Sequence, residues 1–211
     1  MKRVVIWGSG SFAKDIYDAI VLKNTVDEYD LIGFIDDFSS TSTRVIGNKY
    51  ILGNRNFPLE IDYGGIHIIL GFTDPKGKED AIKYADLNRI KLATFISSQS
   101  HVSPSAKIGD GSVIQHYAHV GHGVRVGRGV RVGNHCHISH DSSAGDFSTI
   151  SPYAGMCGDC TLKKGAFMSV RSTLMKGVTM GEFSYLGAGS ILNKDLNDHQ
   201  RAVGFKPRVI K

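Results

Sequence analysis

A six-residue period runs unbroken through the second half of the chain. Stepping by six from Val102 to Leu192 gives sixteen positions, and every one is apolar. Four residues after each lies a small side chain, and only the last of these positions, Leu196, is larger. An α-helix repeats about every 3.6 residues and a simple strand every two, so neither produces this pattern. The period predicts a hexapeptide solenoid whose stacked coils share one core.

Three hexads make one three-sided coil, so residues 18 apart should lie above one another at the strand spacing of about 4.8 Å. The series predicts a prism of roughly five coils with an aliphatic interior. Glycine follows the apolar residue in seven hexads, where we expect tight corners. The repeat does not set the hand of the coil, and the general rule for crossovers would favour a right-handed one.

The first 95 or so residues follow a different pattern. Apolar runs at 3–8, 31–37, 66–72 and 92–96 read as strands, and segments 11–22 and 79–88 have helical spacing. Strands that alternate with helices indicate an α/β domain with a parallel sheet. The polar, serine-rich stretch 97–105 marks a boundary. We therefore predict a Rossmann-like nucleotide-binding domain over 1–97 and a solenoid over 98–211.

A glycine-rich turn joins the first strand to the first helix. The turn is the loop Gly8-Ser9-Gly10-Ser11. Such a loop can hold a phosphate against the N-terminus of the helix that follows. Asp36 and Asp37 end the next strand, where they could accept from ribose hydroxyls or base N–H groups, or simply cap a turn. An NAD-dependent oxidoreductase is a weak alternative, because the domain is far shorter than a two-halved dinucleotide fold.

Composition excludes several classes of protein. A net charge of +5 with no dense run of lysine or arginine argues against a nucleic-acid partner. No stretch approaches the roughly 20 apolar residues of a membrane span, and the N-terminus reads as a strand rather than a signal peptide. Three cysteines without a secretory signal favour free thiols in the cytoplasm.

Two groups of reactive side chains fall in the solenoid. His122 and His140 are 18 residues apart and should share a corner, and Asp141 follows His140. A histidine beside a carboxylate on a rigid coil suits a general base, whereas most of the other histidines read as solvated positions. The pair Cys157-x-x-Cys160 lacks the second half of a zinc site, and Cys160 falls in the inward small position, so we expect core packing.

Several segments together resemble a known family. The chain carries "FIDD", "HVSPSAKIGDGSVI", "GNHCHISHDSSAGDF" and "YLGAGSIL". It is similar to the bacterial NeuD/PglD-type sugar acyltransferases, which acetylate sialic acid or the amino group of nucleotide-linked amino sugars. The resemblance implies a left-handed β-helix and a cytoplasmic homotrimer that makes precursors of surface polysaccharides such as lipopolysaccharide or O-antigen.

The resemblance also implies roles for individual residues. It makes His140 the general base, with Asp141 and Asn134 beside it. It assigns the nucleotide-linked sugar to the glycine loop, Phe12, Asp36 and Asp37. It places acetyl-CoA, as co-substrate, in a groove between subunits, and it expects no metal. The expected CoA-binding residues are Gly158, whose amide would face the oxyanion, Lys163, Lys164, Arg171, Lys176, Gly187 and Ala188.

The chain departs from the family pattern in three places. Phe12 and Thr149 stand where relatives carry histidine, and the tail "GFKPR" differs from the usual ending. The Phe12 difference bears on how the sugar or phosphate is held, and the tail on the contacts of the last residues.

The implied reaction is direct transfer, in which a sugar amine attacks the thioester while His140 accepts its proton. A sugar O-acetyltransferase of the sialic-acid type remains open. So does a γ-carbonic-anhydrase-like zinc lyase using His135 and His140, although Gln99 stands where its third ligand should be. A non-catalytic nucleotide-sugar binder is the remaining alternative.

Overall fold

The computed structural model describes residues 1–58 and 65–204. The N-terminal domain has one six-stranded sheet in the order β3-β4-β2-β1-β5-β6, parallel except for the β3–β4 pair. Its strands are β1 (Lys2–Trp7), β2 (Tyr29–Ile35), β3 (Arg44–Ile46), β4 (Lys49–Gly53), β5 (His67–Leu70) and β6 (Lys91–Leu92). Its helices are α1 (Ser11–Val21) and α3 (Pro75–Leu87). In the described part of the chain, no helix is long and apolar enough to cross a membrane.

The strand order makes this the Rossmann-like domain that we predicted. From β1 the chain winds outward through β2 and β4, then returns to place β5 on the other side of β1. The loops after β1 and β5 therefore diverge and leave a crevice at the carboxyl edge of the sheet, where such folds bind ligands. Helix α1 packs on the sheet through Ala13, Ile16 and Ile20, whose spacing puts them on one face.

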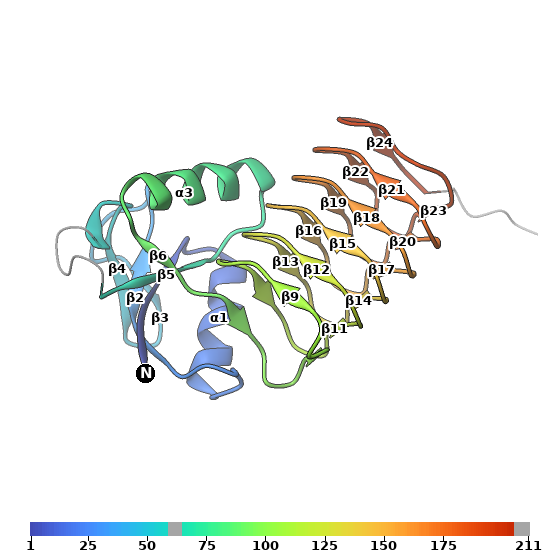
Figure 1. The fold of residues 1–211 in the computed structure, drawn as a ribbon. Coiled ribbons are helices and arrows are strands. Elements are labelled where there is room, and N and C mark those ends of the chain that lie inside the picture. Colours follow the sequence, from blue (N-terminus) through green and yellow to red (C-terminus); the bar gives the residue numbers. More distant parts are fainter. Residues whose placement is uncertain (59–64, 205–211) are drawn as a thin grey trace, which may run out of the picture.

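The C-terminal domain is the expected left-handed parallel β-helix, a prism of two-residue strands in three parallel sheets (Figure 1). Sheet 1 contains β7 (Phe95–Ile96), β10 (Val113–Ile114), β13 (Arg131–Val132), β16 (Thr149–Ile150), β19 (Phe167–Met168), β22 (Tyr185–Leu186) and β24 (Arg201–Ala202). Sheet 2 contains β8 (His101–Val102), β11 (His119–Val120), β14 (His137–Ile138), β17 (Gly155–Met156), β20 (Thr173–Leu174) and β23 (Ile191–Leu192). Sheet 3 contains β9 (Lys107–Ile108), β12 (Arg125–Val126), β15 (Ser143–Ala144), β18 (Thr161–Leu162) and β21 (Thr179–Met180).

The interior follows the six-residue period. From Ile114 to Leu192 every apolar position of the series is buried, and from Ser112 to Leu196 every small position is buried as well. Residues 18 apart pair in register, as His119 does with His137. β7 already pairs with β10, so the solenoid begins a few residues before position 98.

The corners differ from the expectation based on glycine. The left-handed backbone falls three residues after the apolar position, at glycines such as Gly123 (φ 68°) and at side-chain-bearing residues such as Asp141 (φ 56°). The glycines that directly follow the apolar residue have another cause. A Cβ at Gly109 would lie 2.6 Å from the carbonyl carbon of Gly127 in the next coil, so these glycines allow the coils to stack closely.

The N-terminal domain packs against the first coils of sheet 1 (Figure 1). The guanidinium of Arg131 lies 4.2 Å from the ring centroid of Phe12. Nζ of Lys78, in α3, donates to the Ser148 carbonyl at 2.8 Å and to Oγ1 of Thr149 at 2.7 Å. These contacts fix which side of the prism faces the crevice of the N-terminal domain.

The buried series makes a direct prediction about stability. We expect Leu174→Ala to lower the free energy of unfolding by about 2–5 kcal/mol, because Leu174 is fully buried and the coils cannot close around the gap. Leu87→Ala removes the same atoms from a side chain that is 84% exposed, and should change stability by less than about 0.5 kcal/mol. Urea titration followed by circular dichroism measures both, and equal losses would contradict the assignment of the core.

Candidate active site

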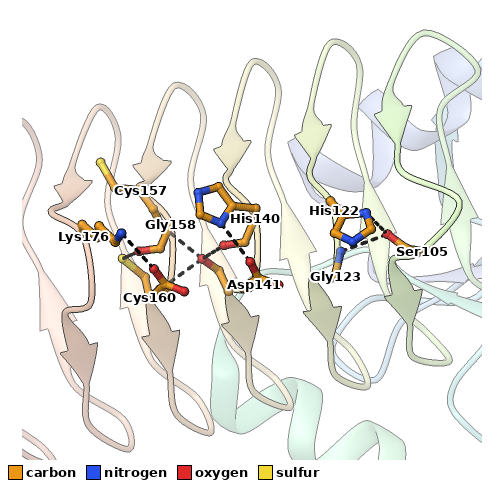
Figure 2. A network of polar contacts seen from close by, with 11 residues as sticks. Ser105, His122, Gly123, His140, Asp141, Cys157, Gly158, Cys160 and Lys176 are labelled. Atoms are coloured by element: carbon orange, nitrogen blue, oxygen red, sulfur yellow. Dashed lines mark hydrogen bonds and ion pairs between the residues drawn. The ribbon is translucent and has the colours of Figure 1, made fainter.

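His140 lies on the corner between β14 and β15, where sheets 2 and 3 meet. Its Nδ1 is 2.9 Å from Oδ2 of Asp141 (Figure 2). The left-handed backbone at Asp141 belongs to this corner, which holds the carboxylate beside the ring of the preceding residue. The carboxylate can fix the tautomer that carries hydrogen on Nδ1, which leaves Nε2 free to accept a proton.

Gly158 lies directly beside this ring in the next coil (Figure 2). A Cβ at position 158 would be 2.6 Å from Cε1 of His140 and 2.7 Å from Nε2, so only glycine leaves room for the imidazole. Across the described residues, the Gly158 amide donates no hydrogen bond. A free backbone N–H beside a proton acceptor is the arrangement that an acyl-transfer transition state requires.

His122 shares the corner, as its spacing predicted, but its environment differs. Its Nδ1 contacts Oγ of Ser105 at 2.9 Å, and that hydroxyl also accepts from the Gly123 amide at 3.0 Å. Glycine at 123 leaves His122 without an adjacent carboxylate. The structure therefore forms a histidine–carboxylate pair at His140 and not at His122.

One group of potential metal ligands stands out. Within residues 1–58 and 65–204, only His140, Asp141 and Asp159 bring three donor atoms close enough together to hold an ion. Nζ of Lys176 lies 3.4 Å from Oδ2 of Asp159. His135, the other ligand expected for a zinc lyase, is on the neighbouring corner and stacks between Tyr117 and Tyr153. The ligand set of that alternative is not assembled within one chain.

The remaining residues expected near the base are spread over the three corners of the prism. Asn134 lies one corner away from His140, and its Oδ1 is buried with no hydrogen-bond partner in the described part of the structure. Gly187 and Ala188 share the corner of Asn134, one side of the prism from the base. Arg171 belongs to the same region, where its guanidinium lies 5.2 Å from the ring of Tyr153.

The expected phosphate-binding cations are also dispersed. Nζ of Lys164 pairs with Glu79 of α3 at 2.9 Å, which raises the pKa of Lys164 and ties the domains together. Lys163 lies 3.8 Å from Asp198 on the same corner as Lys164. Lys176 alone of the four shares the corner of His140. Within one chain these lysines and Arg171 do not form a single cluster.

A cavity of about 570 Å³ occupies the crevice of the N-terminal domain. The predicted loop lines it, and Gly8 has φ 107°, a conformation that favours glycine. Gly10 caps α1 with open space around its Cα, so the first amides of the helix can approach a ligand. Asp36 also lines the cavity, where it accepts from Oγ of Ser9 at 2.6 Å and from the amide of Phe38 at 2.9 Å.

Asp37 has a structural partner that the sequence did not reveal. Nη2 of Arg55 lies 2.7 Å from Asp37, and Nη1 lies 3.0 Å from Asp80. The same guanidinium lies 5.2 Å from the ring of Trp7. These residues come from four separate segments, and no local motif connects them. Trp7 and Asp37, each at the end of a predicted strand, could be placed near the crevice from the sequence, whereas Arg55 and Asp80 could not.

Phe12 and Thr149, which replace histidines of the family, both lie where the two domains meet. Phe12 lines the cavity, and the guanidinium of Arg131 lies over its ring. Thr149 is buried, and its hydroxyl accepts from Lys78 and donates to the Thr73 carbonyl at 2.9 Å. The unusual tail begins at Gly204, but residues 205–211 lie outside the described part of the chain.

The cavity and His140 are on opposite sides of the solenoid. The N-terminal domain covers sheet 1 through Phe12, Lys78 and their partners in β13 and β16. His140 is on the corner formed by the other two sheets. A ligand held in the cavity of one chain therefore lies across the prism from the base of that chain.

Two family models match separate parts of the chain. The model of the PglD N-terminal domain matches residues 3–85, and that of the bacterial transferase hexapeptide, six repeats, matches residues 105–140. The predicted resemblance to the NeuD/PglD type is confirmed. Two curated relatives, the bifunctional GlmU proteins of Rubrobacter xylanophilus and Brevibacillus brevis, are 37% identical over 75 residues and 32% identical over 121 residues. These segments are 35% and 57% of this chain, but only 16% and 23% of the two relatives.

Solved structures share this fold over nearly the whole chain. PerB from Caulobacter crescentus, in complex with CoA and GDP-perosamine, has a TM-score of 0.86 at 21% identity and covers 97% of this chain and 95% of its own. The acetyltransferase domain of PglB from Neisseria gonorrhoeae, in complex with acetyl coenzyme A, has a TM-score of 0.86 at 24% identity, with 96% of each chain covered. WeeI from Acinetobacter baumannii has a TM-score of 0.85 at 16% identity, with 97% of each chain covered.

Two of the three cysteines pack in the core. Cys136 and Cys160 are buried free thiols, and they donate to the carbonyls of Ser151 at 3.0 Å and Met175 at 3.1 Å. Burial raises the pKa of Cys136 to about 12 and also raises the pKa of Cys160. Cys157 is only partly buried.

We therefore expect one fast-reacting thiol at pH 8. Cys136 and Cys160 remain protonated and covered there, so Cys157 alone should react with a disulfide reagent in the native protein. Cys157→Ser should abolish the fast phase, and denaturant should release the other two thiols. Two or three fast thiols in the native protein would contradict the packing described above.

The close contact between Gly158 and His140 predicts that a substitution at position 158 lowers activity without a matching loss of stability. We expect Gly158→Ala to displace the imidazole and to lower kcat at least about tenfold, because a small error in placing a base is costly. Gly155→Ala is the matched control, since a Cβ at position 155 meets nothing within 4 Å. Steady-state kinetics and thermal melts would be measured for both variants. Full activity in Gly158→Ala would show that the position of the ring is not critical.

Proposed function

We propose that this protein transfers the acetyl group of acetyl-CoA to the amino group of a nucleotide-linked amino sugar. The observation that carries the proposal is the His140 ring, held by Asp141 on one side and lying beside the free Gly158 amide on the other. A base and an N–H donor on adjacent coils are the two groups that direct acyl transfer requires.

Each residue has a distinct role in the proposed reaction. Nε2 of His140 accepts the proton from the amine as its nitrogen bonds to the thioester carbonyl carbon. Asp141 stabilises the imidazolium that forms, and the Gly158 N–H donates to the developing oxyanion. The C–S bond then breaks, and His140 returns its proton to the departing thiolate of CoA. Asn134, one corner away, is proposed to support this site only from a neighbouring subunit.

The acceptor is proposed to bind in the cavity of the N-terminal domain. The Gly8–Ser11 loop and the start of α1 suit the diphosphate, and Asp36 suits hydroxyls or N–H groups of the nucleoside. PerB, which has the same fold, was crystallised with CoA and GDP-perosamine, and the PglB domain with acetyl coenzyme A. These complexes support a nucleotide sugar and acetyl-CoA as the substrates here.

We further propose a homotrimer in which the cavity of one subunit faces His140 of another. The separation of the two sites across the prism supports this arrangement, because neither can serve the other within one chain. Acetyl-CoA would lie in the groove between subunits along the corner of His140, Gly158 and Lys176. The other expected CoA-binding residues, Lys163, Lys164, Arg171, Gly187 and Ala188, could contribute only from a neighbouring copy.

The decisive experiment is a screen of UDP-, GDP- and dTDP-linked amino sugars with acetyl-CoA, with free CoA quantified. We expect release with one nucleotide class, and we expect His140→Ala to lower kcat about 100-fold or more. The control is His122→Ala, which removes the equivalent histidine one coil earlier and should leave kcat nearly unchanged.

Several outcomes would overturn the proposal. No CoA release with any amino sugar would rule out N-acetylation of this class, and release only with hydroxyl-bearing sugars would assign O-acetylation by the same residues. Undiminished turnover in His140→Ala would remove the proposed base.

A further inference from the structure

The walls of the cavity have the wrong charge for an anionic ligand. Four aspartates line it, Asp36, Asp37, Asp74 and Asp80, against a single arginine, Arg55. That arginine is already paired with Asp37 and Asp80. The N-terminus of α1 offers the equivalent of only about half a positive charge. A diphosphate in this cavity therefore needs positive charge from somewhere else.

Two cations lie behind the cavity wall, between the two domains. Lys78 is 1% exposed, and its Nζ donates only to the Ser148 carbonyl and the Thr149 hydroxyl. Arg131 donates from Nε and Nη2 to Oε1 of Gln115 at 3.1 and 3.0 Å. All of these acceptors are uncharged. In the part of the chain that the structure describes, neither cation has a carboxylate within ion-pair distance.

Both cations lie next to residues that line the cavity. Arg131 stacks on Phe12, which lines the cavity beside the phosphate loop. Lys78 is followed along α3 by the cavity residue Ala81, and through Thr149 it is linked to the carbonyl of Thr73, which also lines the cavity. A charge in a dry interior is weakly screened, so its field reaches past these residues.

We propose that Lys78 and Arg131 are positioning residues that make the cavity selective for a diphosphate without touching it. The inference rests on the proposed function and deepens it, since it names two residues that give the cavity its preference for the diphosphate. Buried charge without a partner costs stability, and an anionic ligand bound nearby offsets that cost.

The surroundings of Lys78 disfavour its charged form. Burial, and secondarily the charge of Arg131, lowers the pKa of Lys78 well below its usual range, while Asp74 opposes that shift. Asp15 lies near Arg131 and partly balances it. A bound diphosphate would favour the protonated lysine.

The test compares nucleoside diphosphates with bare nucleosides. The fluorescence of Trp7, the one tryptophan of the chain and part of the cavity wall, reports binding of UDP, GDP and dTDP and of uridine, guanosine and thymidine. We expect Lys78→Met and Arg131→Met to weaken binding of the preferred diphosphate about five- to twentyfold. Binding of the matching nucleoside should be unchanged. Arg131→Lys, which keeps the charge, should restore most of the affinity.

The matched control is Thr149→Val, which removes a hydrogen-bond partner of Lys78 but no charge. It should leave the ratio of diphosphate to nucleoside affinity unchanged. Thermal melts identify any variant that fails to fold, and the Arg131 pair tests the proposal if Lys78→Met does not fold.

The outcomes separate the two proposals. The inference would be overturned if the variants lost the same affinity for diphosphate and nucleoside, or if neither charge-removing variant lost affinity. Lys78 and Arg131 would then contribute only to packing, and the proposed function would be unaffected. Failure of the wild-type protein to bind any nucleoside diphosphate would instead remove the nucleotide site from the proposed function, and this inference with it.

Discussion

The whole molecule depends on filling a narrow triangular interior with one aliphatic and one small side chain per hexad. That filling fixes the direction of every outward side chain, because a slip of one residue would expose the core. It also holds successive coils at the strand spacing of about 4.8 Å. The contact between His140 and Gly158 is a product of that spacing. The stacking of the coils holds the backbone at Gly158 directly beside the imidazole of His140.

Much of the solenoid could be predicted because its geometry is periodic. The buried series, the shared corner of His122 and His140, and the place of Gly158 all follow from spacing alone. The six-residue spacing also places Asn134, Lys163, Lys164 and Arg171 on corners other than that of His140. The family resemblance had assigned them to the catalytic and CoA-binding site. Arg55 and Asp80 could not be placed in this way. Their partners come from segments that meet only after the α/β domain has folded.

Two of the three places where this chain departs from the family pattern lie in the contact between the domains. Phe12 offers a flat face to Arg131, and Thr149 offers one hydroxyl that serves both Lys78 and Thr73. A fully buried lysine is costly, and here two acceptors from the solenoid take only two of its three N–H donors. The attachment of the N-terminal domain and the electrostatics of its cavity therefore depend on the same few side chains.

A solenoid repeats not only its fold but also its sites. Along the corner of His140 each coil presents the same two adjacent positions, so the backbone alone does not distinguish one coil from the next. One coil earlier the pair is His122-Gly123, a base without a carboxylate, and one coil later it is Gly158-Asp159, a carboxylate without a base. Only the middle coil carries both. The corner thus offers the same two backbone positions in every coil, and the side chains at those positions decide which coil holds the histidine–carboxylate pair.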